Sequence, residues 1–289
     1  MSGGVQAGPG TPVCPPEWLD LREPADHLAL EEGAGTLLGT LCESLDPAPG
    51  GLVVRDLGCG TGSLARRLAP RLPDAGRGQH WQLHDRDAGL LDRALAGLPA
   101  GVTGEAALGD LTRLDAGALS GTALVAASAL LDLLTAAEVE HLAAACAAAG
   151  SVVLLTLSVS GRVRLSPGEP LDAELAGAFV AHQRRDVGGR RLLGPDAAPA
   201  TAAALRAHGY RVHTAPSPWR LGPSSAGLTD EWLDGWLAAA CAQRPDLAAT
   251  APAYAARRRA QLADGALDVR IGHVDLLAVP WPRSRGARA

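Results

Sequence analysis

A loop of three glycines preceded by an acid is the segment of the chain best suited to hold a small ligand. It reads DLGCGTG over residues 56–62, follows a short apolar run and opens a helical pattern. Glycines let the backbone turn tightly and bring peptide N–H groups against a ligand, and a helix that begins there favours an anionic group. The spacing is G-x-G-x-G, which differs from the G-x-G-x-x-G fingerprint of dinucleotide-binding proteins.

Two further acids follow strand-like segments downstream of this loop. Asp85 ends the segment HWQLHD, 23 residues after Gly62, where a carboxylate can accept hydrogen bonds from both hydroxyls of a ribose. Asp110 follows a weaker strand-like segment over residues 102–108, and its carboxylate can accept from an exocyclic amine. The two acids therefore predict contacts with a ribose and with an amine.

The elements that must position these residues alternate between strands and helices. We expect strands over residues 52–56, 80–85, 102–108, 123–128 and 151–159. One helix runs from Asp87 to about Leu95, and another begins at the capping box Thr135–Glu138 and stops at Gly150. This alternation predicts an α/β fold with a doubly wound parallel sheet.

The two ends of the chain carry further elements. Residues 16–45 have a helical pattern, in which we expect Pro24 to begin a new segment. Residues 211–219 and 269–280 are strand candidates, separated by a helix that starts near Thr229. These late strands would complete the sheet.

Composition excludes several kinds of protein. The chain has 289 residues, 47% of them hydrophobic and 20% charged, which excludes wholesale disorder. All 26 basic residues other than histidine are Arg; without Lys there is no Schiff-base, pyridoxal-phosphate or Walker A lysine. The net charge is −5, whereas nucleic-acid-binding proteins usually have an excess of basic residues, so we do not expect a nucleic-acid partner. The absence of Lys and Asn, whose codons are AT-rich, indicates a GC-rich, bacterial genome.

Neither a membrane segment nor a disulfide framework is expected. No run of 18 apolar residues is free of charges and helix breakers, and no N-terminal stretch has the pattern of a signal peptide. The five cysteines are scattered and none forms a C-x-x-C pair. We therefore expect a soluble, cytoplasmic protein.

The motifs resemble those of class I S-adenosylmethionine-dependent methyltransferases. VVRDLGCGTGSLA resembles their motif I, LHDRDAGLL motif II, LGDL at residues 108–111 motif III, and ALVAASALLDLL at residues 123–134 the fourth-strand motif. The resemblance covers residues from about 50 to 160. It implies a Rossmann-like, mostly parallel seven-stranded sheet with one antiparallel strand, flanked by N-terminal helices and a helical insertion after strand five. It also implies that S-adenosylmethionine is the cofactor.

The resemblance assigns the cofactor to the carboxyl ends of strands one, two and four. Asp56 would orient the glycine loop and the amino group of the methionine moiety, Asp85 the ribose, and Arg86 and Asp110 the adenine. Cys59 is expected to be structural rather than a nucleophile. The residues expected around the cofactor are Asp56, Gly58, Cys59, Gly60, Gly62, Asp85, Arg86, Gly109, Asp110, Leu111 and Ser128. No cysteine pair or metal-ligand cluster resembles those of metal-dependent relatives, so no metal is expected.

The acceptor side is less well defined by the sequence. The sulfonium already activates the methyl group, so a base is required only where the acceptor is protonated. His182, in the segment HQRRD of the insertion, and Asp132, after strand four, are the catalytic candidates. Trp18, Arg22 and Arg184 are the candidate substrate-binding residues; an arginine can hold a carboxylate or phosphate with two hydrogen bonds.

We expect one methyltransferase domain over residues 14–282, with flexible tails over 1–13 and 283–289. Its expected parts are an N-terminal lid at 14–48, a cofactor-binding core at 50–160, an acceptor-side insertion at 165–206, and C-terminal strands and a helix at 208–282. The predicted function is methyl transfer to oxygen or nitrogen of a small molecule, by a monomer or a homodimer. An RNA or protein methyltransferase and a non-catalytic S-adenosylmethionine-binding module stay open as alternatives. A nicotinamide-dependent enzyme is disfavoured by the glycine spacing.

Overall fold

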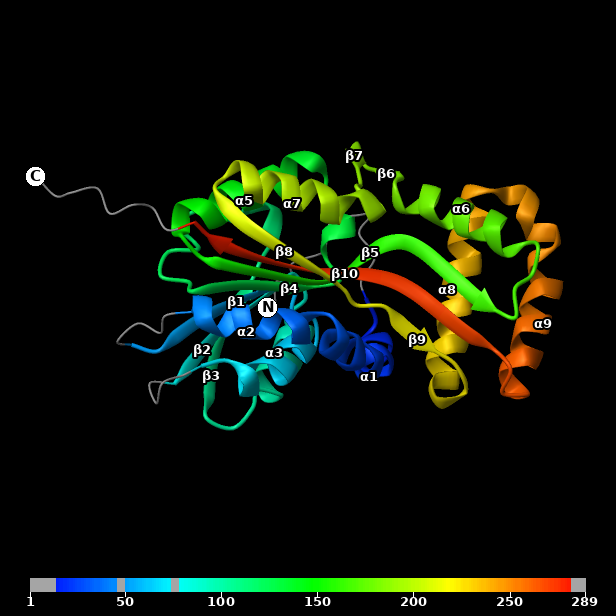
Figure 1. The fold of residues 1–289 in the computed structure, drawn as a ribbon, viewed down its shortest axis with the longest axis horizontal. Helices are drawn as coiled ribbons and strands as arrows, with labels where there is room; N and C mark the ends of the chain where they lie inside the picture. The colour runs from blue at the N-terminus through cyan, green and yellow to red at the C-terminus, as the bar shows by residue number, and fades with distance from the viewer. Residues whose placement is uncertain (1–13, 46–49, 74–77, 282–289) are drawn as a thin grey trace, which may run out of the picture.

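A twisted β-sheet runs along the length of the molecule, with helices on both of its faces (Figure 1). The computed structural model describes residues 14–45, 50–73 and 78–281; both predicted tails, 1–13 and 283–289, lie outside them. Along the sheet, seven strands follow the order β3-β2-β1-β4-β5-β10-β8. They are β1 (Leu52–Leu57), β2 (Gln79–Asp85), β3 (Val102–Leu108), β4 (Leu124–Ser128), β5 (Val152–Ser166), β8 (Tyr210–Pro216) and β10 (Asp268–Pro280).

The strand directions confirm the predicted fold class. β3, β2, β1, β4 and β5 are parallel neighbours, whereas β10 runs antiparallel to both β5 and β8. This is the α/β, mostly parallel seven-stranded sheet with one antiparallel strand that the sequence resemblance implies. Because the strands β1, β2, β3, β4 and β5 are parallel, their carboxyl ends share one edge of the sheet, where open α/β sheets bind ligands.

Apolar side chains fill a core on each face of the sheet. One face is covered by α2 (Ala34–Ser44), α3 (Ser63–Leu68) and α4 (Ala88–Ala96). The other is covered by α5 (Ala136–Ala149) and α7 (Ala197–Ala207). The inner strands contribute to both cores; Val54 and Leu57 of β1 are fully buried, as expected of strands with helices on both sides.

The caps of α5 are those that the sequence predicts. Thr135 Oγ1 accepts from the N–H of Glu138, and the Glu138 carboxylate accepts from the N–H of Thr135. Gly150 ends the helix with φ +72°, a left-handed conformation that glycine adopts without strain. The cap places the first turn of α5 at the carboxyl edge of the sheet.

The prediction that Pro24 begins a new helix is wrong. Helix α1 (Pro16–Glu32) runs through Pro24 without a break and ends at Gly33. Proline removes the hydrogen bond to the carbonyl of Asp20, four residues earlier. Asp20 and Pro24 are both exposed, so water can solvate that carbonyl, and the opposite side of α1 packs into the protein.

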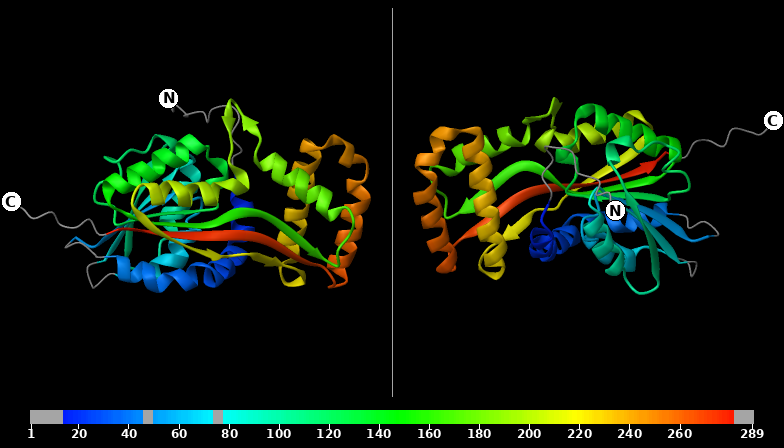
Figure 2. Two further views of the ribbon diagram at one scale, coloured as in Figure 1. Left: turned by 45° about the horizontal axis from the view of Figure 1, so that its top comes forward. Right: turned by 180° about the vertical axis from the view of Figure 1, so that it is seen from behind.

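β5 and β10 continue beyond the core as a curved extension. The prediction ended the fifth strand at Val159, but β5 reaches Ser166, and the short β9 (Trp219–Leu221) pairs with β10 there. Helices α6 (Asp172–Gln183), α8 (Ala226–Gln243) and α9 (Ala251–Ala263) pack with one face of the extension. Seen from behind in Figure 2, the gold and orange helices α8 and α9 lie in front of these strands.

A local irregularity bends the sheet where the extension begins. Leu157 has φ +55°, and its N–H donates to Oδ1 of the buried Asp275 at 2.8 Å. Ser217 Oγ donates to the same oxygen at 2.5 Å. The pairing of β5 with β10 shifts register nearby, between Val274 and Leu276. Such shifts re-aim side chains and increase the twist.

Short elements complete the chain. A hairpin of β6 (Asp186–Val187) and β7 (Arg190–Arg191) follows α6. Single 3-10 turns follow several strands and helices: η1 (Ala69–Arg71), η2 (Leu111–Arg113), η3 (Leu131–Leu133), η4 (Gly194–Asp196), η5 (Pro223–Ser225) and η6 (Pro245–Ala249). None of the helices in the described ranges is both long enough and apolar enough to cross a bilayer.

Arg258 of α9 provides a test of how the extension is held together. Its fully buried guanidinium bonds to the carboxylate of Asp172 and to the carbonyl of Pro167. Arg258→Met would leave Asp172 without this buried partner, which should lower the free energy of unfolding by about 3–5 kcal/mol. Arg257→Met, next to it, removes an exposed guanidinium that pairs with Glu169 and bonds to the carbonyl of Ala253, so it should cost far less. Urea unfolding of both variants measures the difference; equal losses would contradict it.

Candidate functional site

The glycine loop lies between β1 and α3 in the conformation that its sequence requires. Gly58, Gly60 and Gly62 all have positive φ, between +54° and +83°. A Cβ on Gly62 would lie 3.0 Å from the backbone of Ala94, so a larger residue there would be both strained and crowded. The loop therefore brings its peptide groups to the carboxyl edge of the sheet.

Asp85 holds this loop from the end of β2. One carboxylate oxygen accepts from the N–H of Gly60 at 3.0 Å. The other accepts from the N–H groups of Arg86 and Asp87, at 2.7 and 3.1 Å. Each carboxylate oxygen has two lone pairs, so Asp85 keeps acceptor capacity for a ligand.

Asp56 is a buried acid whose carboxylate lacks a partner. The residue is 1% exposed, and neither oxygen has a hydrogen bond within the described part of the chain. Burial, and then the negative charge of Asp85, raise the pKa of Asp56 to about 7. Buried polar groups in folded proteins are almost always hydrogen-bonded, so these two oxygens fit a site that receives a cationic donor. Thr61 Oγ1, in the same loop, is likewise buried and unpartnered among the described residues.

Cys59 contributes a small buried side chain to the loop. Burial, followed by the charges of Asp56 and Asp85, raises the pKa of its thiol far above the usual range. A nucleophilic cysteine needs a lowered pKa. The environment of Cys59 therefore suits the structural role that the sequence predicts.

The residues predicted around the adenine lie at the ends of β2 and β3. The N–H of Gly109 donates to the carbonyl of Asp85 at 2.9 Å, which ties these two ends together. Asp110 is exposed, and its carboxylate accepts from both the N–H and the hydroxyl of Thr112. Leu111 is half-buried against the core beneath α5, and Arg86 is exposed.

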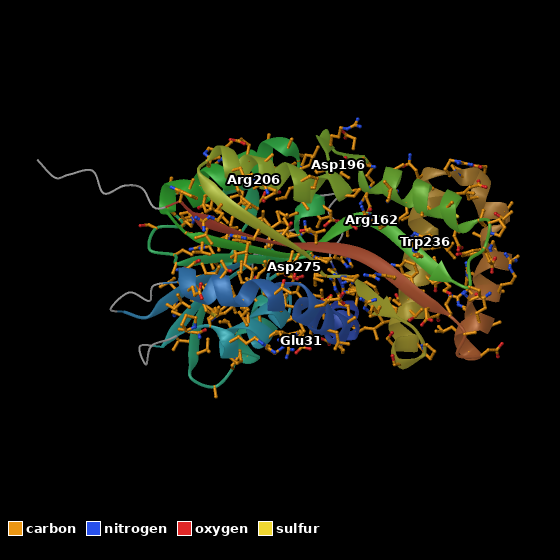
Figure 3. The ribbon with its side chains drawn as sticks, in the orientation of Figure 1. Glu31, Arg162, Asp196, Arg206, Trp236 and Asp275 are labelled. Carbon is orange, nitrogen blue, oxygen red and sulfur yellow. The ribbon has the colours of Figure 1, made fainter. Side chains whose placement is uncertain are left out.

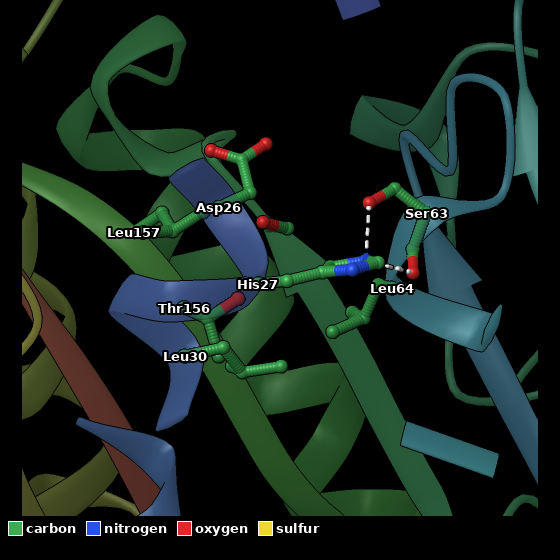
Figure 4. A pocket seen from close by; sticks show the side chains of 8 residues that line it. Asp26, His27, Leu30, Ser63, Leu64, Thr156 and Leu157 are labelled. Atoms are coloured by element: carbon green, nitrogen blue, oxygen red, sulfur yellow. Dashed lines mark hydrogen bonds between the residues drawn. The ribbon is translucent and has the colours of Figure 1, made fainter. Parts of the chain in front are cut away.

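Helix α1 closes the site at the end of β4. Ser128 there lines a cavity of about 10 Å³, which α1 borders through Asp26 and His27 (Figure 4). His27 Nε2 lies 3.1 Å from Ser63 Oγ, at the start of α3. About two turns earlier on α1, a Cβ on Gly60 would lie 3.1 Å from Leu19 Cδ1, so this helix also covers the glycine loop.

Ion pairs fasten α1 over the loop. Glu23 accepts two hydrogen bonds from Arg66 of α3, at 2.9 and 2.5 Å, and Asp20 pairs with Arg93 of α4 at 2.7 Å. Leu19, Glu23 and His27 were not among the predicted site residues, which on this helix were Trp18 and Arg22. The three missed residues are four apart in the sequence, so they share one face of α1. That spacing would have indicated site residues only if α1 had been known to pack against the glycine loop.

The two catalytic candidates share a charged neighbour. Burial raises the pKa of Asp132 in η3 to about 6, opposed by the positive charges of Arg22 and Arg185. Burial, together with the charge of Arg185, lowers the pKa of His182 in the last turn of α6. Arg185 donates to the backbone carbonyl of His182 at 3.1 Å. Around neutral pH, Asp132 can therefore accept a proton and His182 is neutral.

Trp18 and Arg22 extend this region along the inner face of α1. The Arg22 guanidinium lies 5.0 Å from the ring centroid of Trp219 and pairs with Asp26 at 2.9 Å. The ring centroids of Trp18 and Trp219 are 6.5 Å apart. Burial raises the pKa of Asp26, and Arg22 opposes that effect. Arg22 is thus already paired with Asp26, and its positive charge also acts on Asp132.

Arg184 lies in a larger groove at the start of α5. The groove has a volume of about 560 Å³ and lies between the first turn of α5 and the β6–β7 hairpin. Arg184 donates two hydrogen bonds to Asp196, at 2.5 and 2.8 Å, and Arg190 pairs with Glu138 at 2.8 Å. The structure therefore separates Arg184 from the small cavity beside Ser128.

Comparison with known proteins gives similarity in fold alone. No family model and no curated protein matches the sequence. A cyclopropane synthase from Mycobacterium tuberculosis is 13% identical, over 87% of this chain and 86% of that one, with a TM-score of 0.44. The geranyl diphosphate C-methyltransferase of Streptomyces coelicolor A3(2), solved with Mg²⁺, geranyl diphosphate and S-adenosyl-L-homocysteine, is 12% identical, over 86% and 79%, with a TM-score of 0.43.

Because Asp56 is a buried carboxyl group without a partner among the described residues, we predict that replacing it stabilises the fold, by an amount that depends on pH. A carboxyl group whose pKa is about 7 when folded and about 3.8 when unfolded costs the folded state free energy that grows as pH rises from 4 to 7. We expect Asp56→Asn, measured without added ligand, to raise the free energy of unfolding by about 4 kcal/mol at pH 8 and by less than half of that at pH 5. Denaturant titrations at both pH values test this; the same gain at each would contradict it.

Proposed function

We propose that the chain is an S-adenosylmethionine-dependent methyltransferase that acts on a small molecule. The observation that carries the proposal is the pair of unpartnered Asp56 oxygens, buried beside a glycine loop with three positive φ angles. An ammonium group is a cationic donor that would satisfy them. The methionine portion of the cofactor has such a group, whereas a nicotinamide dinucleotide places anionic phosphates at this loop. The buried acid thus favours the first ligand over the second.

The remaining cofactor residues would each make one contact. Asp85, at the end of β2, would accept from the ribose at the one acceptor position that the N–H groups of Gly60, Arg86 and Asp87 leave free. Arg86, Gly109, Asp110 and Leu111 would border the adenine. Ser128, at the end of β4, would border the methyl donor.

The chain's part in methyl transfer is to position the acceptor and to hold a proton. When bound, S-adenosylmethionine supplies a methyl group already activated by its sulfonium. Asp132 would accept the acceptor's proton at its carboxylate, and the neutral imidazole of His182 is the second candidate for that role. α1 excludes water from this edge of the sheet. Oxygen and nitrogen acceptors both fit this arrangement.

A thermal-shift titration with S-adenosylhomocysteine tests cofactor binding. At about 100 times its dissociation constant, a ligand specific for the folded state adds roughly 2.7 kcal/mol, which should raise Tm by a few degrees. Asp85→Ala should lose most of this shift because the ribose loses its acceptor. Asp92→Ala, an exposed acid on α4, should keep it. No shift of the wild type at millimolar ligand, or an equal shift in all three proteins, would sink the assignment.

The pH dependence of turnover tests the role of Asp132. Because burial raises its pKa to about 6, the fraction of ionised Asp132 increases between pH 5 and 7. With an acceptor that is protonated at working pH, the turnover rate should rise over the same interval. Asp132→Asn should lower the rate by about 10²–10⁴-fold and remove the rise, while the affinity for S-adenosylhomocysteine is kept. A variant with an unchanged rate and pH profile would show that Asp132 is not the base; His182→Gln is the matched comparison.

A further inference from the structure

Four arginines share the open face of the extension. Arg162 and Arg164 lie on β5, Arg270 on β10 and Arg220 on β9, and all four are exposed. Arg270 is directly opposite Arg164 on one side and Arg220 on the other, and cross-strand partners point to the same face. Arg162 is two residues from Arg164 and therefore points the same way. We call these four residues the arginine face.

The arginine face is not needed to cover the protein's own core. Its strands bury the alternate residues, such as Val163, Leu165 and Val269, against the cluster beneath α6, α8 and α9. No helix crosses over the opposite face of these strands in the view of Figure 1. The fold therefore requires only that this second face be polar.

Few acids balance the charge of the arginine face; Asp268, two residues from Arg270 on the same side of β10, forms no ion pair within the described residues. Like charges directly opposite on neighbouring strands destabilise a sheet. Arg220 pairs with Glu32 at 2.8 Å, but Arg162, Arg164 and Arg270 have no acidic partner within residues 14–45, 50–73 and 78–281. Exposed arginines elsewhere, such as Arg93, Arg244 and Arg257, each pair with an acid. A net charge of −5 makes this concentration of positive charge more notable.

We propose that the arginine face docks an extended acidic segment of a partner protein. The guanidinium fork matches a carboxylate with two hydrogen bonds. Arg162 and Arg164 repeat at about 6.8 Å along β5, which is also the repeat of alternate side chains in an extended peptide. Two acids separated by one residue can thus meet both arginines at once.

Other anionic partners fit this face less well. Single-stranded nucleic acid is held by aromatic side chains that stack on bases. Trp219, next to Arg220 in β9, is buried on the opposite face of that strand. A membrane surface calls for exposed apolar side chains beside the basic ones. The residues that alternate with the arginines point inward instead.

A binding assay with charge-reversed variants tests the proposal. The probe is fluorescein-labelled poly-L-glutamate, measured by anisotropy at low salt. The variant Arg164→Glu/Arg270→Glu should bind about tenfold more weakly or worse. The control Arg206→Glu/Arg211→Glu makes the same change of net charge on exposed residues of α7 and β8, at the other end of the sheet (Figure 3), and should lose less than about twofold.

Three further results separate this proposal from its alternatives. If the double reversal does not fold, the neutral triple variant Arg162→Gln/Arg164→Gln/Arg270→Gln replaces it and should also bind more weakly. Equal losses in the variant and the control would overturn the proposal. It would also be overturned if an oligonucleotide or phosphatidylserine vesicles bound more tightly than poly-L-glutamate through the same arginines. The S-adenosylhomocysteine shift should be the same in every variant, so this test and that of the proposed function fail independently.

Discussion

The antiparallel pairing of β5 with β10 is the constraint on which the rest of the structure depends. The inner ends of these two strands complete the core sheet, and their outer ends form the extension with β9. Between the two parts, Leu157 adopts a positive φ and its N–H is held by Asp275. One pair of strands thus completes the core sheet that carries the glycine loop and also fixes the direction in which the arginine face points.

At the carboxyl edge, stability and ligand binding are in opposition. Asp56 and Asp85 place two acids beside one loop, but only Asp85 is satisfied by the loop's own N–H groups. Burying an unpaired carboxylate costs free energy that the surrounding core must offset. A cation bound at Asp56 would pair with the carboxylate and recover that free energy. The recovered free energy would then contribute to the affinity for the ligand.

The sequence predicts the features that depend on neighbouring residues. The glycine loop, the end of β2 at Asp85 and the caps of α5 follow from short motifs, and each is confirmed as local structure. The outer half of β5 was missed although its apolar and arginine residues alternate, because the bulge at Leu157 interrupts that pattern. The pairing of Arg184 with Asp196 depends on where the hairpin folds back, which no short motif encodes.

The tight cover of α1 over the loop has a kinetic consequence. A cavity of about 10 Å³ has room for roughly one water molecule, far less than a nucleoside-sized ligand needs. Such a ligand can fill the cavity beside Ser128 only in molecules in which α1, which borders the cavity through Asp26 and His27, has moved. The observed association rate is then the rate for the open form multiplied by its population. Because α1 must move first, a small ligand would exchange slowly, although the contacts that it makes once bound would be unchanged.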